Sequence, residues 1–572
     1  MLHDAHDLPS GAVLEADICI VGAGPAGIAI ALELARRGVD TCVLEGGGTE
    51  PDPAAQSLHE GTVRGDHYPP LAETRWRQLC GTTHLWNTRL GPAHGFRAAP
   101  LDAIDFERRD WAPYSGWPFG LEHLEPYYRR AQEFCALGPY AYGGASWETP
   151  EGPQLKLDPA VCNTSVWQFT PRERFTEGLR AEMERSPRAA VWLHANVTEL
   201  ETNETAGEVS RVHAATPEGK AFSVRARTVV LATGGIENAR ILLLSNRVQE
   251  AGIGNGHDLV GRYFMEHQVV SGGILTPRDR ALLDTAALYD ERPVNGTWVM
   301  GQIRFTEELM RRERLLNLSF ALYPRHPRHE RIRTEAIHSF EALARSVLRL
   351  RPPAEVGRHL REVLRSADFV AASMLRKASG QRLFRYFVPG PDLVSGDGWS
   401  ALPDKQRRFG AFAVLLHTEQ LPHPDNRVVL SEERDRLGCR RPELQWRWRD
   451  EDRESVARAQ RIFADEVERA GIGSYAPLTD DEGQLVLRAS GLHHHMGTTR
   501  MHPDPKQGVV DADARVHGVG NLYVAGCSVF PTGGYINPTL TIVAMALRLA
   551  DHLADRARST PAVEASTVAQ ES

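Results

Sequence analysis

Near the start of the chain, the hydrophobic pattern changes from that of a strand to that of a helix across one glycine-rich turn. Residues 17–21 form a short β-branched run, and apolar residues with helical spacing follow over 28–35. The turn over 22–27 reads Gly-Ala-Gly-Pro-Ala-Gly, and a second apolar strand over 39–44 ends at Glu45. This order of strand, glycine turn, helix, strand and acid is typical of a dinucleotide-binding fold.

The three glycines of the turn, Gly22, Gly24 and Gly27, suit close contact with a pyrophosphate. Side chains there would block the backbone, and the helix that follows offers free N–H groups and the positive end of its dipole. Glu45 stands at the distance where an acid can bind the hydroxyl pair of a ribose. Because the chain contains 50 glycines, the motif alone is weak evidence. Its context predicts a dinucleotide site rather than a glycine-rich turn that binds nothing.

Beyond residue 46 the pattern predicts blocks of loop, sheet and helix, with a short tail before them over residues 1–15. In chain order, the blocks are loops over 47–115, a helix over 122–137, strands over 191–200, 209–214 and 222–226, a buried strand over 228–233 with a helix over 237–244, strands over 411–446, and a helix over 455–470. Strands alternate with helices, which predicts an α/β protein.

Residues 276–410 differ from the rest because they are rich in arginine, with amphipathic stretches over 331–350 and 355–376. A basic amphipathic helix can lie on an acidic membrane surface or on a protein partner. Solvated arginines above a stripe that faces the core are the simpler interpretation.

Composition and charge exclude several classes of protein. The chain has 572 residues, 42% of them hydrophobic, and a net charge of −8, which argues against nucleic-acid binding. Its seven cysteines are scattered singly, so neither a disulfide framework nor a zinc site is expected. The first residues are polar and no uncharged apolar run is long enough to span a bilayer. We therefore expect a cytoplasmic protein without a membrane span.

The C-terminal region carries the strongest chemical signal. Residues 492–498 contain three consecutive histidines before a Gly-Thr pair, and Asn537-Pro538-Thr539 opens an apolar helical segment. A histidine and an asparagine, each beside a turn, suit proton removal from an alcohol. For His494 the alternative is a buried structural histidine, and for Asn537 it is helix capping, which does not exclude catalysis.

Three histidines in a row also raise the possibility of a metal. On an extended segment, His493 and His495 would face away from His494, and the chain has no carboxylate or cysteine pattern beside them. The sequence therefore predicts no metal site.

Several motifs together resemble the glucose–methanol–choline (GMC) oxidoreductases, a family of FAD-dependent alcohol oxidisers. They occur in the family's order and touch most of the chain outside 276–410. They are Val21–Gly27, Gly81–Trp86, Ser115–Pro118, Val230–Asn238, Asp258–Arg262, Pro424–Val428 and the C-terminal block. The Asn-Pro-Thr-Leu-Thr segment is most similar to the sugar-oxidising branch that includes pyranose 2-oxidase.

This resemblance implies the site. His494 would be the catalytic base and Asn537 its partner at the substrate oxygen. FAD would be held by Gly22, Gly24, Gly27, Glu45, Thr82, Thr83, Val197, Gly526, Cys527, Pro538 and Thr539. Some sugar-oxidising relatives attach FAD to a histidine directly before the tryptophan of the 81–86 loop. Here Leu85 has that place and His84 lies one residue earlier, so we expect noncovalent FAD. Directly after Trp86, where many relatives carry glycine, this chain has Asn87.

The resulting hypothesis is an α/β flavoprotein with a Rossmann-like FAD domain and a sheet-based substrate domain. The FAD domain would comprise 12–115, 185–275 and 490–557. A connecting segment would span 116–184, the substrate domain 276–489 and a disordered tail 558–572. We expect oxidation of a CH–OH group on a sugar, glycoside or cyclitol, with oxygen, a quinone or an electron-transfer protein as acceptor. The alternatives are a sterol-like or other non-sugar alcohol, a non-redox lyase on the same scaffold, or a flavin-free NAD-binding module.

Overall fold

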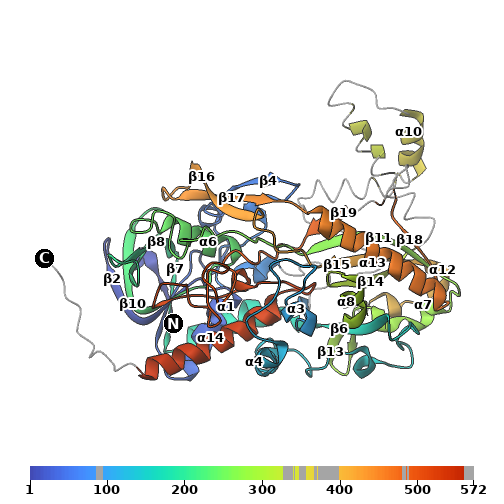
Figure 1. Cartoon of the computed structure of the whole chain (residues 1–572), viewed down its shortest axis with the longest axis horizontal. Coiled ribbons are helices and arrows are strands. Elements are labelled where there is room, and N and C mark those ends of the chain that lie inside the picture. The colour runs from blue at the N-terminus through green and yellow to red at the C-terminus, as the bar shows by residue number, and fades with distance from the viewer. Residues whose placement is uncertain are drawn as a thin grey trace.

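Two large sheets lie next to each other along the long axis of the molecule (Figure 1). The structure, a computed structural model, describes residues 1–85, 94–325, 356–365, 398–479 and 488–559, with a few single positions between 336 and 370 and Leu485. The Trp86–Asn87 pair and much of the two amphipathic stretches lie outside the described residues. So does the predicted C-terminal tail except Arg558 and Ser559, which end helix α14 (Thr539–Ser559).

The first sheet has eight strands and contains the dinucleotide motif. Its order is β1-β7-β3-β2-β10-β9-β8, and β20 pairs with β10. The strands from β1 to β10, together with β20, run parallel, whereas β9 and β8 are antiparallel. Their bounds are β1 Leu2–Asp4, β2 Val13–Val21, β3 Thr41–Leu44, β7 Ala189–Leu193, β8 Asn196–Thr202, β9 Val209–Ala215, β10 Ala221–Leu231 and β20 Leu522–Val524.

Packing explains why the β2 turn needs small residues. Helix α1 (Pro25–Arg36) starts directly after the turn and packs against β2 and β3, with nearly all its apolar side chains buried. A Cβ atom on Gly27 would lie 1.9 Å from the Gly22 carbonyl oxygen, and one on Gly22 would lie 2.7 Å from the Ala232 carbonyl oxygen. Gly22 also has a φ of +102°, which side chains disfavour. Glycine at 22 and 27 therefore lets the helix begin against the sheet.

The second sheet has nine strands and is antiparallel throughout. Its order is β18-β11-β15-β14-β13-β6-β5, with β12 on β13 and β19 on β11. Helix α13 (Asp450–Arg469) contacts β18 and runs across this sheet (Figure 1). The bounds are β5 His94–Ala98, β6 Cys162–Pro171, β11 Gln268–Pro277, β12 Arg292–Val294, β13 Thr297–Phe305, β14 Leu318–Arg325, β15 Ala411–Thr418, β18 Gly473–Pro477 and β19 Arg488–Gly491.

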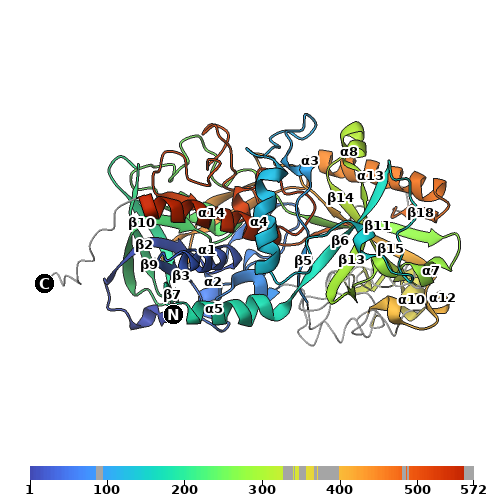
Figure 2. The ribbon, with the colours of Figure 1, turned by 90° about the horizontal axis from the view of Figure 1, so that it is seen from below.

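Helices and a small sheet join the two halves. Helix α14 (Thr539–Ser559) contacts α1 on one side and α4 (Leu121–Phe134) on another, and α4 lies between the two large sheets (Figure 2). A three-stranded sheet has the order β16-β17-β4. The remaining bounds are β4 Thr62–Gly65, β16 Arg427–Arg434, β17 Arg440–Trp446, α2 Pro53–Ser57, α3 Ala103–Phe106, α5 Leu179–Arg185, α6 Gly235–Leu244, α7 Leu282–Thr285, α8 Glu307–Glu313, α10 Val356–Arg365 and α12 Lys405–Arg408.

The α/β fold class is confirmed, but the prediction of a tail over residues 1–15 is wrong. Strand β1 pairs with β7, and β2 begins at Val13. Polar composition hid β1 because this strand lies at the edge of the sheet, where its side chains are only half-buried. The predicted domain bounds remain a proposal. Strand β6 of the predicted connecting segment and strand β5 of the predicted FAD domain both join the nine-stranded sheet.

No helix in the described part of the chain is both long enough and apolar enough to cross a membrane.

Candidate functional site

One cleft brings the N-terminal and C-terminal motifs together. It holds about 1230 Å³ of space between atoms and is partly open to solvent. The glycine turn after β2 lines one end, and the histidine segment lines another part. The lining residues predicted from the sequence are Gly22, Gly24, Glu45, Thr82, Val197, His494, Gly526, Cys527, Pro538 and Thr539.

The start of α1 offers an anion site within this cleft. Gly24 is the residue that caps the helix, and Pro25 occupies its first turn. Because Gly24 has no side chain to accept from the first N–H groups, these groups and the positive end of the dipole stay available to a bound phosphate. Gly27 does not line the cleft and acts instead through the close packing of the turn.

Glu45 connects the two loops at the nucleotide end. Its carboxylate accepts hydrogen bonds from the N–H groups of Ala23 at 2.9 Å and Gly47 at 2.8 Å. Burial raises the pKa of Glu45, and these hydrogen bonds oppose that shift. The carboxylate therefore holds the glycine turn and the loop after β3 together where a ribose is expected.

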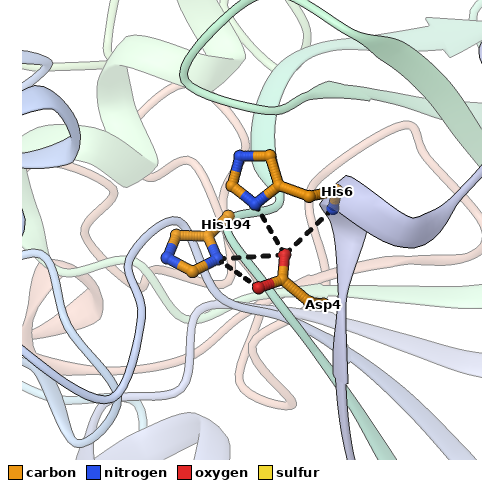
Figure 3. A group of neighbouring side chains, drawn as sticks. All are labelled: Asp4, His6 and His194. Atoms are coloured by element: carbon orange, nitrogen blue, oxygen red, sulfur yellow. Dashed lines mark hydrogen bonds and ion pairs between the residues drawn. The ribbon is translucent and has the colours of Figure 1, made fainter.

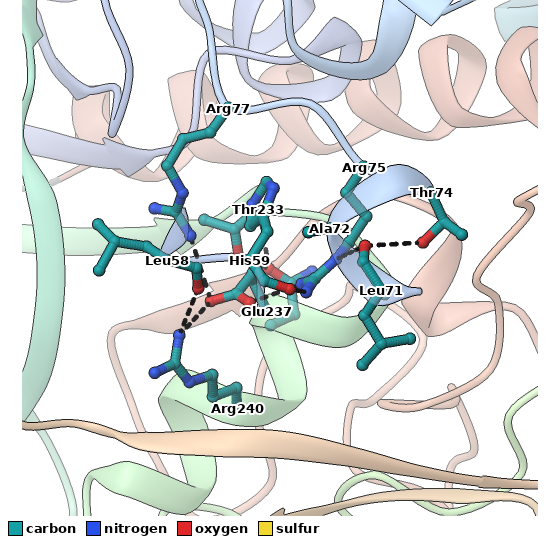
Figure 4. A network of polar contacts seen from close by, with 12 residues as sticks. Leu58, His59, Leu71, Ala72, Thr74, Arg75, Arg77, Thr233, Glu237 and Arg240 are labelled. Carbon is teal, nitrogen blue, oxygen red and sulfur yellow. Dashed lines mark hydrogen bonds and ion pairs between the residues drawn. The ribbon is translucent and has the colours of Figure 1, made fainter. Parts of the chain in front are cut away.

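Three arginines surround Glu237 on the cleft wall (Figure 4). Arg75 donates to Glu237 at 2.6 Å, Arg240 lies 3.3 Å and Arg77 3.6 Å from its carboxylate, and Arg240 also pairs with Asp435 at 2.6 Å. Although burial alone would raise it, the guanidinium groups hold the pKa of Glu237 at about 2. The network contains three arginines and two carboxylates, those of Glu237 and Asp435. It therefore has a net charge of one positive unit beside the cleft.

The histidine segment does not alternate as the sequence predicts. His493 has a φ of +64°, so the chain turns there instead of staying extended. As a result His493, His494 and His495 all line the cleft. The prediction that His493 and His495 face away from His494 is wrong, because it assumed the period of a regular strand.

The hydrogen bonds of His494 define which of its nitrogens carries a proton. Its Nδ1 lies 2.9 Å from Nδ1 of His267, whose Nε2 lies 3.2 Å from the Gly533 carbonyl oxygen. A carbonyl only accepts, so neutral His267 carries its proton on Nε2 and accepts at Nδ1. His494 must then donate from Nδ1. Its Nε2 is left with a free lone pair, as a general base requires.

Burial keeps this pair of imidazoles neutral. It lowers the pKa of His267 to about 4 and holds the pKa of His494 well below the usual histidine range. His493 shows the same effect, with a pKa lowered by burial to about 4. The cluster is therefore uncharged at neutral pH, and His494 is ready to accept a proton.

Glu266 and Tyr68 hold the histidine segment from behind. The Glu266 carboxylate accepts from the His494 backbone N–H at 2.8 Å and from the Tyr68 hydroxyl at 2.5 Å. Both side chains are buried. Burial raises the pKa of Glu266 to about 7, and the hydrogen bonds that it accepts oppose this shift. Two anchored oxygens thus fix the backbone that carries His494.

Three other predicted residues lie outside the cleft lining. Thr83 is buried, and its hydroxyl has no hydrogen-bond partner among the residues that the structure describes. Asn537 is half-buried, directly before Pro538 and two residues before the start of α14. It therefore precedes the usual capping position. His84, on the 3-10 turn Gly81–Leu85, places its Nε2 2.9 Å from the Leu79 carbonyl oxygen.

Sequence reasoning missed His267, Glu266, Tyr68, Arg75 and Arg77. A signal for two of them was present, because Glu266-His267 follows the Asp258–Arg262 motif after three intervening residues. Nothing in the sequence shows that this dipeptide contacts the histidine segment. His267 pairs with His494, which lies 227 residues later in the chain.

Comparisons with known proteins show which families and folds the chain resembles. The family described as "GMC oxidoreductase" matches residues 422–546, and the one described as "FAD dependent oxidoreductase" matches residues 17–249. The chain is similar to the solved structure of a pyridoxine 4-oxidase, described as from "Mesorbium loti", with a TM-score of 0.52 and 16% identity. That match covers 94% of this chain and 99% of the other and shows the shared fold.

Two curated relatives align over nearly their whole length. They are the fructose dehydrogenase large subunit of Gluconobacter japonicus and the 2-methyl-1,2-propanediol dehydrogenase of Mycolicibacterium austroafricanum. Each is 23% identical, covering 95% and 96% of this chain respectively and 98% of the relative. The C-glycoside 3-oxidase of Arthrobacter globiformis is 36% identical over 126 residues, which cover 22% of this chain and 23% of that protein.

Proposed function

Because the chain belongs to the GMC oxidoreductases and is an FAD-dependent oxidoreductase of alcohols, we propose that it oxidises a CH–OH group of a sugar, glycoside or cyclitol to a carbonyl. One observation carries this proposal. His494 lies in the same cleft as the dinucleotide turn, and its Nε2 is free to accept a proton.

The residues of the cleft fit FAD. The start of α1 and the surplus positive charge of Arg75, Arg77 and Arg240 suit the pyrophosphate. The buried Nε atom of Arg77 has no hydrogen-bond partner among the described residues. Glu45 suits the ribose, Val197 the adenine, and Thr82 the flavin ring. Gly526 with Cys527 would lie near the phosphates or the ribityl chain, and Pro538 with Thr539 near the pyrimidine of the flavin.

The mechanism that we propose divides the reaction between protein and cofactor. FAD, when bound, supplies the acceptor for the hydride of the carbinol carbon. His494 accepts the hydroxyl proton at Nε2, while its Nδ1–H continues to donate to His267. Because His267 stays neutral, it stabilises the positive charge that develops on His494. Asn537 would hold the substrate oxygen without competing for the proton.

Two features support noncovalent FAD. The Nε2 atom of His84 faces the Leu79 carbonyl oxygen, and His84 is not among the residues that line the cleft. A covalent link there would require the ring to leave this hydrogen bond. We therefore propose that heat or acid releases FAD intact from the protein.

The relatives favour a sugar-like substrate but also leave one alternative. Fructose dehydrogenase and C-glycoside 3-oxidase act, by name, on a sugar and on glycosides. The 2-methyl-1,2-propanediol dehydrogenase acts, by name, on a small diol and aligns over nearly the same length as the fructose enzyme. A small non-sugar alcohol is therefore the second candidate. Oxygen, a quinone or an electron-transfer protein would accept the electrons.

The test is anaerobic mixing of the yellow protein with sugars, glycosides, cyclitols, small diols and sterols. We expect the flavin absorbance to bleach with a member of the first three classes, and admission of air then shows whether oxygen is an acceptor. Bleaching by diols alone would favour the second candidate. A yellow protein that converts a substrate without bleaching would overturn the proposal in favour of a lyase.

The Glu45→Gln variant should bind FAD more weakly. A neutral amide cannot accept from Ala23 and Gly47 as strongly as the carboxylate does, and hydrogen bonds to charged groups contribute about 1.5–3 kcal/mol. We expect roughly a 10- to 100-fold higher Kd, measured by the rise in flavin fluorescence on dilution. Equal FAD retention in wild type and variant would refute the assignment of Glu45 to the ribose end.

A further inference from the structure

A second group of polar side chains lies on the outer edge of the eight-stranded sheet. Asp4, His6 and His194 point toward one another (Figure 3). One possible ligand atom from each residue, a ring nitrogen or a carboxylate oxygen, lies within 4.8 Å of the others. His6 Nδ1 is 2.7 Å from Asp4 Oδ1, and His194 Nδ1 is 3.1 Å from both Asp4 oxygens.

The fold brings these residues together from distant parts of the chain. Asp4 ends β1, whose parallel pairing with β7 places it opposite Leu193, and His194 is the next residue. His6 lies on the short turn Ala5–Asp7, where Asp4 accepts a hydrogen bond from its backbone N–H. His194 has a φ of +56°, which is strained for a residue with a side chain.

Glu218 specifies how His6 is protonated. Its carboxylate lies 2.7 Å from His6 Nε2, on the side of the ring opposite Asp4. An ionised carboxylate only accepts, so Nε2 carries a proton. A neutral His6 would then present a lone pair at Nδ1 to the lone pairs of Asp4. Such a contact at 2.7 Å requires a cation between the two atoms, either a proton or a metal ion.

The same Glu218 contact is typical of metal sites. Histidines that bind metals usually donate their other N–H to a carboxylate, which orients the ring and makes it a stronger ligand. Two imidazoles and one carboxylate also form a ligand set that zinc and similar ions accept, with water completing the coordination. The carboxylates of Asp4 and Glu218 together balance a double positive charge.

We propose that Asp4, His6 and His194 bind a divalent transition-metal ion of the zinc class, with Glu218 orienting His6. Ligands about 2.0–2.2 Å from zinc can lie up to about 4 Å apart. Since the three atoms already lie within 4.8 Å of one another, small side-chain movements complete the site. Binding displaces the proton between His6 Nδ1 and Asp4, so the reaction releases a proton, whereas a neutral His194 only moves its own proton from Nδ1 to Nε2.

The site would brace the nucleotide end of the cleft. The His194 N–H donates to the Gly47 carbonyl at 3.0 Å, and the Ala195 N–H donates to the Glu45 carbonyl at 2.8 Å. A Cβ atom on Gly48 would lie 2.6 Å from the His194 ring. Holding His194 therefore also holds the loop that carries Glu45. This consequence is separate from the redox chemistry and does not depend on the substrate.

Zinc titration of the chelator-treated, FAD-loaded full chain tests the proposal by calorimetry. We expect one ion per chain, with proton release that shows as a dependence of the heat on the buffer. His6→Ala should weaken binding by at least about 100-fold. Glu218→Gln should weaken it by roughly 10- to 100-fold, as is usual for partners of ligating histidines. Cobalt in place of zinc should give a visible spectrum that His6→Ala lacks.

The exposed His257 provides a matched control, because it is a surface histidine outside the group. His257→Ala should bind zinc like the wild type, and circular dichroism should show that all variants are folded. Absence of stoichiometric binding in the wild type would overturn the proposal. So would equal affinity in wild type and His6→Ala, since the zinc would then bind elsewhere. In either case Asp4, His6 and Glu218 would form a protonated ion-pair cluster.

Discussion

Replacing His494 by alanine is expected to slow anaerobic flavin reduction by about 10²- to 10⁴-fold, the usual contribution of a general base. The variant removes the His494 imidazole, whose Nε2 lone pair is available in the cleft because Nδ1 donates to His267. Its backbone N–H to Glu266 remains, so the segment should keep its conformation. Stopped-flow absorbance under nitrogen measures the rate.

The protein must stay yellow for this result to count. FAD content and the melting temperature of His494→Ala should match those of the wild type, and His257→Ala should reduce its flavin at the wild-type rate. Near-normal reduction in a folded, yellow His494→Ala variant would disprove the assignment of the base.

The pH dependence of the wild type gives a second measure of His494. The base works only when neutral, and burial holds its pKa well below the usual value of about 6.5. As pH falls, the rate should therefore remain on its plateau through pH 6.5 and decline only at lower pH. A decline centred at or above 6.5 would contradict a buried His494 as the base.

His267→Leu is expected to slow flavin reduction by roughly 10- to 100-fold without an equal change in KM. Leucine removes the acceptor for His494 Nδ1–H, and a hydrogen bond to a charged group contributes about 1.5–3 kcal/mol. Without this acceptor, nothing keeps the His494 proton on Nδ1. The positively charged imidazolium of His494 also loses its hydrogen-bond partner. His267 acts through His494 and is therefore a positioning residue.

His267→Asn separates this role from simple packing. The side-chain oxygen of asparagine can accept near the position of Nδ1, so this variant should recover part of the lost rate, whereas the leucine variant should not. Equal loss in both variants, accompanied by equal loss of stability, would mean that His267 only fills space. Full activity in His267→Leu would refute the positioning role.

Sequence patterns predict the parts of the fold that are held by interactions between residues close together in the chain. The β2–turn–α1–β3 unit was recognised because its hydrophobic spacing and its glycines record strand, helix and close packing within about 30 residues. Helix α13 was predicted over 455–470 and extends over Asp450–Arg469. The pattern does not predict the edge strand β1, because the half-buried edge of a sheet carries polar side chains that resemble those of a tail.

The candidate site shows the same division. The sequence placed His494 and the glycine turn in one site through the resemblance to a family, and the structure brings His494, Gly22 and Gly24 into one cleft. The sequence pattern predicts the wrong direction for the side chains of His493 and His495. The left-handed backbone of His493 interrupts the alternation that an extended strand would give. The sequence contained no sign that Tyr68 and Glu266 hold the segment from behind.

The sequence alone thus determined the nucleotide-binding unit, the α/β class and the family, because each depends on residues close together or on motifs kept in order. Only the tertiary structure decided which nitrogen of His494 is free, what holds its backbone, and that Asp4, His6 and His194 converge. These features depend on contacts between residues up to 266 positions apart. No local sequence pattern encodes such contacts, because they form only when distant segments pack together in the folded protein.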